Sequence, residues 1–235
     1  MFKEATKLTP LYHLARGKGA RMVMVGGWQV AADFGDAAAE ATVCRTAVGL
    51  ADFSHWGRLV VEGKEAMGLL QAELGVNEMG IGAATAVNPT THLYRLRPDR
   101  FLVNTVAGEE QALLATLNRA ADQADSLITV GDSSHGLAQL MLVGPHAAQL
   151  LRRLCGLDFH DTVFPTLTAK QSSVAKTTQT ILRHDFGSLP AYSLLGAASL
   201  AVYLWGVVLE AGTGLGVGVV GETAVSQLIA QLMVQ

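Results

Sequence analysis

Two stretches of the chain, DFSHWGRLVVEGKEAMGLLQAELG (52–75) and DSSHGLAQLMLVGPHAAQLLRRLCG (132–156), share one pattern. In each, Asp-x-Ser-His precedes an apolar segment, a glycine follows, and apolar residues then recur at helical spacing. The alternation over residues 58–62 and 139–143 predicts strands, and the i, i+3, i+4 spacing after the glycines predicts amphipathic helices. The sequence therefore indicates two copies of one strand–helix unit, and such internal repeats reveal architecture.

The segments after each copy extend this pattern with turn residues and further apolar runs. They predict a hairpin at 84–96 around Asn88-Pro89, a strand at 100–106, a helix at 107–125, two strands within 171–186, a strand within 188–195, and a helix at 197–212 that ends at Gly212. The order strand–helix–strands–helix, repeated, predicts an α+β fold of two similar ferredoxin-like halves, with antiparallel sheets and helices packed on one face of them. We expect residues 1–50 and 131–235 to form one half and residues 51–130 the inserted half.

The composition excludes some classes of function. Half of the residues are hydrophobic, 16% are charged and the net charge is −3. Nucleic-acid binding needs basic surface that displaces counterions, so we do not expect it here. The two cysteines, Cys44 and Cys155, lack CxxC spacing and are interpreted as reduced, buried thiols of a cytoplasmic protein. The N-terminal residues show no signal-peptide pattern.

The stretch AYSLLGAASLAVYLWGVVL (191–209) has no charged residue, and its length would suffice for a membrane span. Its glycines, serines and tyrosines, and the absence of flanking basic residues, favour another interpretation. We expect a strand followed by a helix, buried on more than one side, with no membrane association. One explanation for the missing charge is a homo-oligomer contact or a partner subunit that covers the C-terminal helix.

The histidines give little sign of catalysis or metal binding. His55 and His135 each follow a serine, but adjacent strand residues point to opposite faces and cannot form a triad-like pair. Their occurrence in both repeats indicates turn or edge roles. His184-Asp185 is either a substitute acid–base pair or a strand-end turn. The seven histidines lack clustered ligand spacing, so we predict no metal site.

Five segments resemble one family in the same order along the chain. They are TPLYHLARGKGARMV (9–23), GGWQVAADFGDAAAEATVCRTAVGLADFSHWGRLVVEG (26–63), LLQAELGVNEM (69–79), LYRLRPDRFLVNT (93–105) and LMLVGPHAAQLLRRL (140–154). They resemble the folate-binding part of the glycine cleavage system T-protein, an aminomethyltransferase. That superfamily includes the gamma subunit of heterotetrameric sarcosine oxidase, folate-dependent demethylases and the YgfZ-like proteins.

The resemblance implies tetrahydrofolate as the cofactor and transfer of a one-carbon unit as the reaction. By the same resemblance, the candidate cofactor-binding residues border a cavity between the two halves. They are Trp56, Tyr94, Asn104, Arg183 and Tyr192. An aromatic side chain there could stack on a pterin or benzoyl ring, although core packing is the alternative role. No catalytic residue is assigned.

The sequence departs from the family at three places. Pro89 and Thr90 occupy positions where the family carries acids, and Ser193 occupies the position of a glutamate that binds the pterin ring. Serine cannot make the bidentate contact of a carboxylate, and neither Thr nor Pro can act as an acid. We also expect the family's C-terminal β-barrel to be lacking.

Three hypotheses follow from these observations. The chain is an aminomethyltransferase-like, tetrahydrofolate-binding protein with degenerate acidic positions. Alternatively, it is a non-catalytic subunit of a multi-subunit oxidase or demethylase, like the sarcosine oxidase gamma chain. The third hypothesis is a pocket that now binds another small molecule. The sequence leaves open whether the protein is an active transferase.

Overall fold

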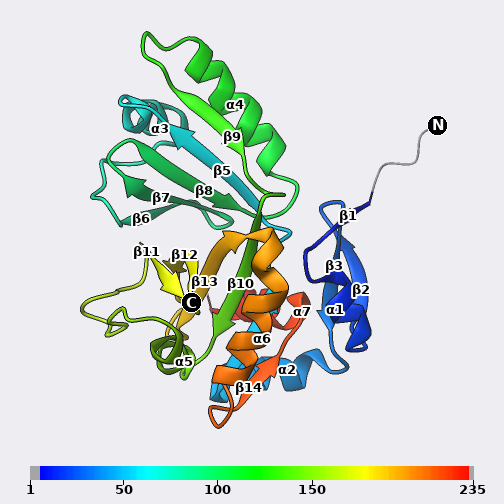
Figure 1. The fold of residues 1–235 in the computed structure, drawn as a ribbon. Helices are drawn as coiled ribbons and strands as arrows, with labels where there is room; N and C mark the ends of the chain where they lie inside the picture. Colours follow the sequence, from blue (N-terminus) through cyan, green and yellow to red (C-terminus); the bar gives the residue numbers. More distant parts are fainter. Residues whose placement is uncertain (1–5, 233–235) are drawn as a thin grey trace, which may run out of the picture. The chain divides into compact units, whose positions relative to one another are not determined.

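A computed structural model describes residues 6–232, which fall into two compact units (Figure 1). The smaller unit holds Trp56–Gly136 and Leu167–Lys170, and the larger unit holds residues 6–55, 137–166 and 171–232. The α+β class and the two similar ferredoxin-like halves are confirmed, and no sheet among the described residues closes into a barrel.

The smaller unit is a five-stranded antiparallel sheet in the order β6-β7-β8-β5-β9. Its elements are β5 (Gly57–Glu62), α3 (Ala66–Leu74), β6 (Ala84–Asn88), β7 (Thr91–Arg97), β8 (Arg100–Thr105), α4 (Glu110–Asp122) and β9 (Thr129–Asp132). Without the edge strand β6, this is the βαββαβ order of a ferredoxin-like fold. The predicted hairpin at Asn88-Pro89 and the predicted helix before residue 125 are confirmed.

Both helices of the smaller unit pack on the same face of its sheet. Leu59 of β5 and Phe101 of β8 share one buried cluster with Leu70 of α3 and Leu117 of α4, all fully buried. Alternate side chains of a strand point to opposite faces, so the residues between these lie on the other face of the sheet. That second face carries the candidate site described below.

The larger unit holds a six-stranded sheet in the order β11-β12-β13-β10-β4-β14 and a three-stranded sheet in the order β1-β3-β2. The elements of its first segment are β1 (Lys7–Leu8), α1 (Tyr12–Gly17), β2 (Arg21–Val25), β3 (Trp28–Asp33), α2 (Ala37–Thr46) and β4 (Val48–Asp52). The later elements are β10 (Leu137–Val143), α5 (Ala147–Leu154), β11 (Thr168–Val174), β12 (Thr177–Arg183), β13 (Ala191–Ala197), the 3-10 turn η1 (Ala198–Leu200), α6 (Ala201–Ala211), β14 (Val217–Val219) and α7 (Glu222–Leu232). The first residues of β11, up to Lys170, belong to the smaller unit.

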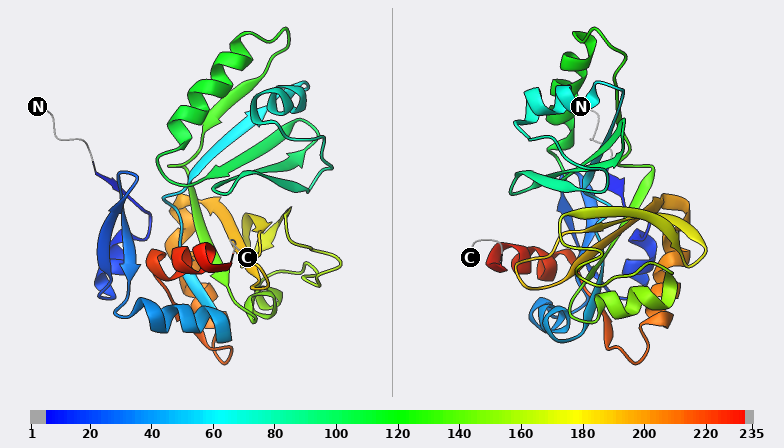
Figure 2. Two further views of the ribbon diagram at one scale, coloured as in Figure 1. Left: turned by 180° about the vertical axis from the view of Figure 1, so that it is seen from behind. Right: turned by 90° about the vertical axis from the view of Figure 1, so that its left-hand side faces the viewer.

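Two details of the larger unit differ from the expected arrangement. Its strands β14 and β4 pair in parallel, as do β1 and β3, whereas antiparallel sheets were expected. Helices also lie on both faces of the six-stranded sheet. Helices α5 and α6 pack against Leu50 and Leu142, whereas a Cβ on Gly49 would meet Cys44 of α2 on the opposite face. Figure 2 shows α7 (red) on the side away from α6.

Each repeat contributes its first strand to the sheet of the other repeat. Strand β4 leads into β5 but pairs with β10, and β9 leads into β10 but pairs with β5. The register is equivalent in the two sheets, with Asp52 opposite Leu140 and Asp132 opposite Leu59. The sequence repeat matches Asp52 with Asp132 and Leu59 with Leu140. The two copies therefore share the register of strand pairing as well as the sequence pattern.

The uncharged stretch consists of the expected strand and helix, β13 and α6. Strand β13 is buried on both faces up to Gly196. Helix α6 is buried on one side only and leaves Val202 and Tyr203 about half exposed. Within residues 6–232, no helix has the length and apolar character that crossing a bilayer requires.

Candidate functional site

A row of polar side chains crosses the helix-free face of the smaller unit's sheet. Arg58 of β5 lies opposite Asn104 of β8, and Asn104 lies opposite His92 of β7. The three residues are 0%, 3% and 4% exposed. Burial of three hydrogen-bonding side chains costs free energy unless each is satisfied, so such a row is a recognisable candidate for a site.

An aromatic residue lies beside this row. Tyr94 is two residues after His92 on β7, so it projects from the same face, and it lies opposite Leu102 of β8. Burial raises the pKa of the Tyr94 hydroxyl above its ordinary value of 10. The ring offers a flat surface for stacking and its hydroxyl offers a donor.

Backbone contacts hold two members of the row in place. The Asn104 side-chain amide donates to the carbonyl of Gly57 over 3.3 Å, and the Arg58 guanidinium donates to the carbonyl of Ser134. The backbone N–H of Arg58 also donates to the Ser134 hydroxyl. The row therefore holds a guanidinium, an amide and an imidazole in a fixed order along one face of the sheet.

Trp56 immediately precedes β5 and is partly buried. It shares the smaller unit with Tyr94 and Asn104, so three of the five predicted cofactor-binding residues lie in this unit. Tyr94 and Asn104 are brought together on one sheet face. Whether these residues contact a cofactor stays a prediction.

The other two predicted residues, Arg183 and Tyr192, are neighbours in the larger unit. They lie opposite one another on β12 and β13, and the guanidinium carbon is 5.2 Å from the centre of the tyrosine ring. Both are almost fully buried. Tyr192 also packs edge-on against Phe159 and Phe164, at centroid distances of 5.8 and 6.0 Å.

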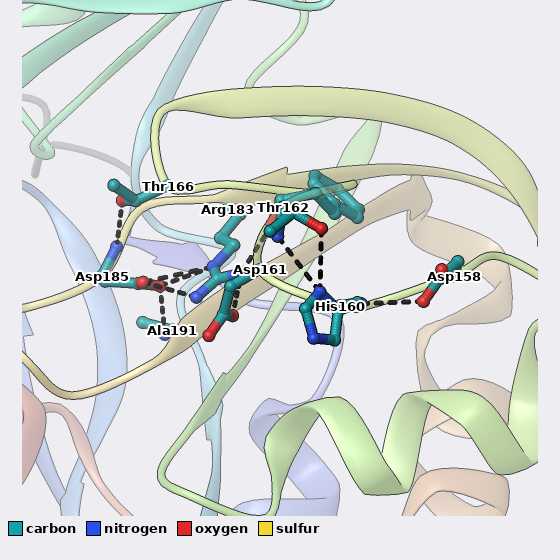
Figure 3. A network of polar contacts seen from close by, with 9 residues as sticks. Asp158, His160, Asp161, Thr162, Thr166, Arg183, Asp185 and Ala191 are labelled. Atoms are coloured by element: carbon teal, nitrogen blue, oxygen red, sulfur yellow. Dashed lines mark hydrogen bonds and ion pairs between the residues drawn. The ribbon is translucent and has the colours of Figure 1, made fainter.

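The Arg183 guanidinium is engaged by protein groups (Figure 3). It makes a bidentate contact with Asp185, through Nε to Oδ1 at 3.0 Å and Nη2 to Oδ2 at 2.8 Å. Its Nη1 contacts Asp161 Oδ1 at 2.7 Å and donates to the carbonyl of Phe164. These contacts connect the loop before β11 to strand β12, so Arg183 has a structural role with or without a bound cofactor.

Asp185 is likewise occupied. Besides Arg183, its Oδ1 accepts from the backbone N–H of Ala191, and its own N–H donates to the Thr166 hydroxyl. Burial lowers the pKa of the neighbouring His184, and the nearby Asp185 charge partly opposes this. Because Arg183, Ala191 and Thr166 engage the carboxylate and backbone of Asp185, the contacts favour the strand-end turn over an acid–base pair.

Ser193, which the resemblance predicts at the position of a pterin-binding glutamate, lies on β13 and is 8% exposed. Its hydroxyl accepts from the Gln139 side-chain amide over 3.1 Å. The two Ser-His pairs have turn roles, as expected. Ser54 accepts from the backbone N–H of Gln139, in the same way as Ser134 accepts from Arg58.

Sequence analysis missed Arg58 and His92 as members of the row. The signal was available in the strand alternation, since Arg58 precedes Leu59 and His92 precedes Leu93, both of which are core residues. A polar residue at alternate positions of a strand normally indicates an exposed face, and only the three-dimensional structure reveals that this face is buried. Among the described residues, no three His, Cys, Asp or Glu side chains are grouped to hold a metal ion.

The GCVT N-terminal domain model matches residues 11–231, almost the entire described chain. The chain belongs to this family. An aminomethyltransferase from Symbiobacterium thermophilum is 30% identical over 222 residues, which cover 89% of this chain and 59% of the relative. An aminomethyltransferase from Thermus thermophilus is 32% identical over 187 residues, covering 73% and 53%. This GCVT-type chain therefore spans less than two thirds of the length of these curated relatives.

Solved structures share the fold of this GCVT-type chain. The glycine cleavage system aminomethyltransferase T from Bartonella henselae superposes with a TM-score of 0.82 at 24% identity, covering 96% of this chain and 62% of that one. A chain of heterotetrameric sarcosine oxidase from Corynebacterium sp. U-96 gives a TM-score of 0.68 at 24% identity, covering 89% and 96%. The predicted superfamily is confirmed.

Proposed function

We propose that this chain is an aminomethyltransferase-like protein that binds tetrahydrofolate and takes part in one-carbon transfer. Membership of the GCVT N-terminal domain family supports this, because its relatives include aminomethyltransferases. The observation that carries the proposal is the buried row Arg58–Asn104–His92 with Tyr94 beside it.

The chemistry of the row fits a folate ring system. An amide side chain both donates and accepts, which matches the mixed N–H and C=O edge of a pterin, and Tyr94 supplies an aromatic surface. Arg58 supplies a positive charge for an anionic part of the cofactor. With serine at position 193 in place of the family's glutamate, we expect weaker binding than a carboxylate-containing site would give.

The test is calorimetric titration of the full chain with tetrahydrofolate and 5-formyltetrahydrofolate. We expect micromolar binding by the unmodified chain and its loss in Asn104→Ala, whereas Asn118→Ala, the same truncation on α4, retains it. Unchanged circular dichroism and unfolding midpoints would show that both variants fold. The absence of binding up to millimolar cofactor would refute the proposal.

A second candidate function is that of a non-catalytic subunit in an oxidase or demethylase complex. The exposed apolar residues Val202 and Tyr203 on α6 favour it, because apolar surface is usually covered in an assembly. Light scattering of the purified chain distinguishes the candidates. A stable monomer that binds folate would support the first, and a homo-oligomer or a chain that binds no folate would support the second. The reduced cysteines support a cytoplasmic location.

A further inference from the structure

A hollow of about 500 Å³ lies within the smaller unit, on the helix side of its sheet. The turn between β6 and β7, the end of β8 and the first half of α4 line it, and it is open to solvent. Its lining residues are Val87, Asn88, Thr91, Thr105, Gly108, Glu109, Ala112, Leu113 and Thr116. The volume lies within the range of small-ligand pockets, roughly 300–1,000 Å³.

The hollow contains one carboxylate, held by hydroxyl groups. Glu109 Oε2 accepts from Thr105 Oγ1 and from Thr90 Oγ1, each over 3.1 Å. The Thr105 hydroxyl is further fixed by Thr91 Oγ1, 2.7 Å away, and both of these threonines are buried. The carboxylate position is therefore set by elements on two sides of the hollow.

This carboxylate is solvent-exposed at the N-terminal end of α4, and no basic side chain among the described residues pairs with it. Glu109 makes no salt bridge there, and its Oε1 has no hydrogen-bond donor among them. Every other lining residue is uncharged. A carboxylate in the lining of a hollow that is otherwise uncharged attracts a cation and repels an anion.

The residues that line the hollow favour an organic cation over a metal ion. Calcium and magnesium need a shell of several oxygen ligands, whereas this hollow has one carboxylate, and the Thr90 and Thr105 hydroxyls already donate to it. Val87 and Leu113 give the hollow an apolar wall that suits a short hydrocarbon chain. Asn88 and the threonines add polar atoms around the carboxylate.

We propose that this hollow binds a small molecule with a primary ammonium group on a short aliphatic chain, with the ammonium at Glu109. The site is independent of the proposed folate row. Thr91 and Thr105 project from the same sheet face as Leu93 and Val103, whereas Asn104 projects from the other.

The experiment is an NMR titration of the full ¹⁵N-labelled chain with three four-carbon probes at constant ionic strength: n-butylammonium, n-butanol and butanoate. We expect saturable shifts with butylammonium at the amides of residues 88–91 and 105–116, and none there with butanol or butanoate. Glu109→Gln keeps the acceptor geometry but removes the charge, so it should weaken butylammonium binding roughly tenfold.

Asp122→Asn is the matched control, since it makes the same charge change at an exposed position on α4. It should bind butylammonium like the unmodified chain. Equal binding of butanol, or an unchanged affinity in Glu109→Gln, would overturn the proposal. Because no folate is present in the titration, neither result depends on the folate site.

Discussion

The backbone N–H of Arg58 donates a hydrogen bond to the hydroxyl oxygen of Ser134 over 2.9 Å. The equivalent residues of the other repeat do the same, since the N–H of Gln139 donates to Ser54 over 3.0 Å. Each serine lies in the turn that follows a strand, β4 for Ser54 and β9 for Ser134. Its hydroxyl accepts a hydrogen bond from a backbone N–H of the paired strand, just beyond the last residue pair of the two strands. The Ser of the Asp-x-Ser-His tetrapeptide therefore has a structural purpose in both copies.

Replacing either serine should destabilise its unit. Ser134→Ala and Ser54→Ala each leave a buried N–H without its acceptor, so we expect the free energy of unfolding to fall by about 1–3 kcal/mol. Urea unfolding measures this. Ser133→Ala, next to Ser134, removes a hydroxyl from a partly exposed residue and should change stability by less than about 0.5 kcal/mol. Equal losses at residues 133 and 134 would contradict the assignment.

The glycines that end the repeated strands should not tolerate a side chain. Gly63 and Gly144 have φ values of +151° and +138°. A Cβ on them would lie 2.6 Å from the Leu127 carbonyl oxygen and 2.4 Å from that of Ala47. We expect Gly63→Ala and Gly144→Ala to cost about 2 kcal/mol or more in denaturant unfolding.

Gly156→Ala is the control for these glycine variants, because no atom lies within 4 Å of its added Cβ and its φ is negative or extended. It should leave the free energy of unfolding within about 1 kcal/mol of the parent, or raise it. A loss at Gly156 equal to that at Gly144 would show that backbone flexibility, not close contact, decides the result.

The contacts of Arg183 should differ sharply in strength. Arg183→Lys loses the bidentate contact with the mostly buried Asp185, and we expect a loss of about 2 kcal/mol or more. Asp161→Asn removes only the charge of a partner that is 81% exposed, and should cost less than about 0.5 kcal/mol. Thermal unfolding of the two variants checks this order, and a reversed order would refute it.

The Tyr192 hydroxyl predicts an alkaline dependence of stability. Burial raises its pKa to about 12, from an ordinary 10. Between these values the unfolded chain releases the phenol proton while the folded chain retains it, so stability falls as pH rises from about 10 toward 12. Chemical unfolding at a series of alkaline pH values should show this decline, and Tyr192→Phe should show a smaller one. Identical slopes for the two chains would refute the assignment.

Much of the fold could be predicted from the sequence because the local patterns are strong. The strand and helix of each repeat follow from alternation before Gly63 and Gly144 and helical spacing after them. The predicted burial of Cys44 and Cys155 is also confirmed, and burial raises the pKa of the Cys44 thiol to about 12. These features depend on near neighbours in the chain.

The features that were missed depend on distant residues. The three-residue strand β14 has too short an alternation to predict, and its parallel pairing is visible only beside β4. The contacts of the Arg183 guanidinium with Asp161, Phe164 and Asp185 were likewise not foreseen, while its role at a cofactor stays a prediction. A sequence pattern can place an arginine on a strand. It cannot show that Asp161 and Phe164, in a loop about twenty residues earlier, contact the guanidinium.

The crossed arrangement of β4 and β9 has a consequence for the origin of the chain. In a single copy of the repeat, made as a separate polypeptide, the first strand would have no strand to pair with, and the sheet would lack one strand. Two identical copies would complete one another by mutual strand exchange, as domain-swapped homodimers do. Duplication and fusion of such a dimer would produce the equivalent pairs Asp52–Leu140 and Asp132–Leu59 that the two sheets share.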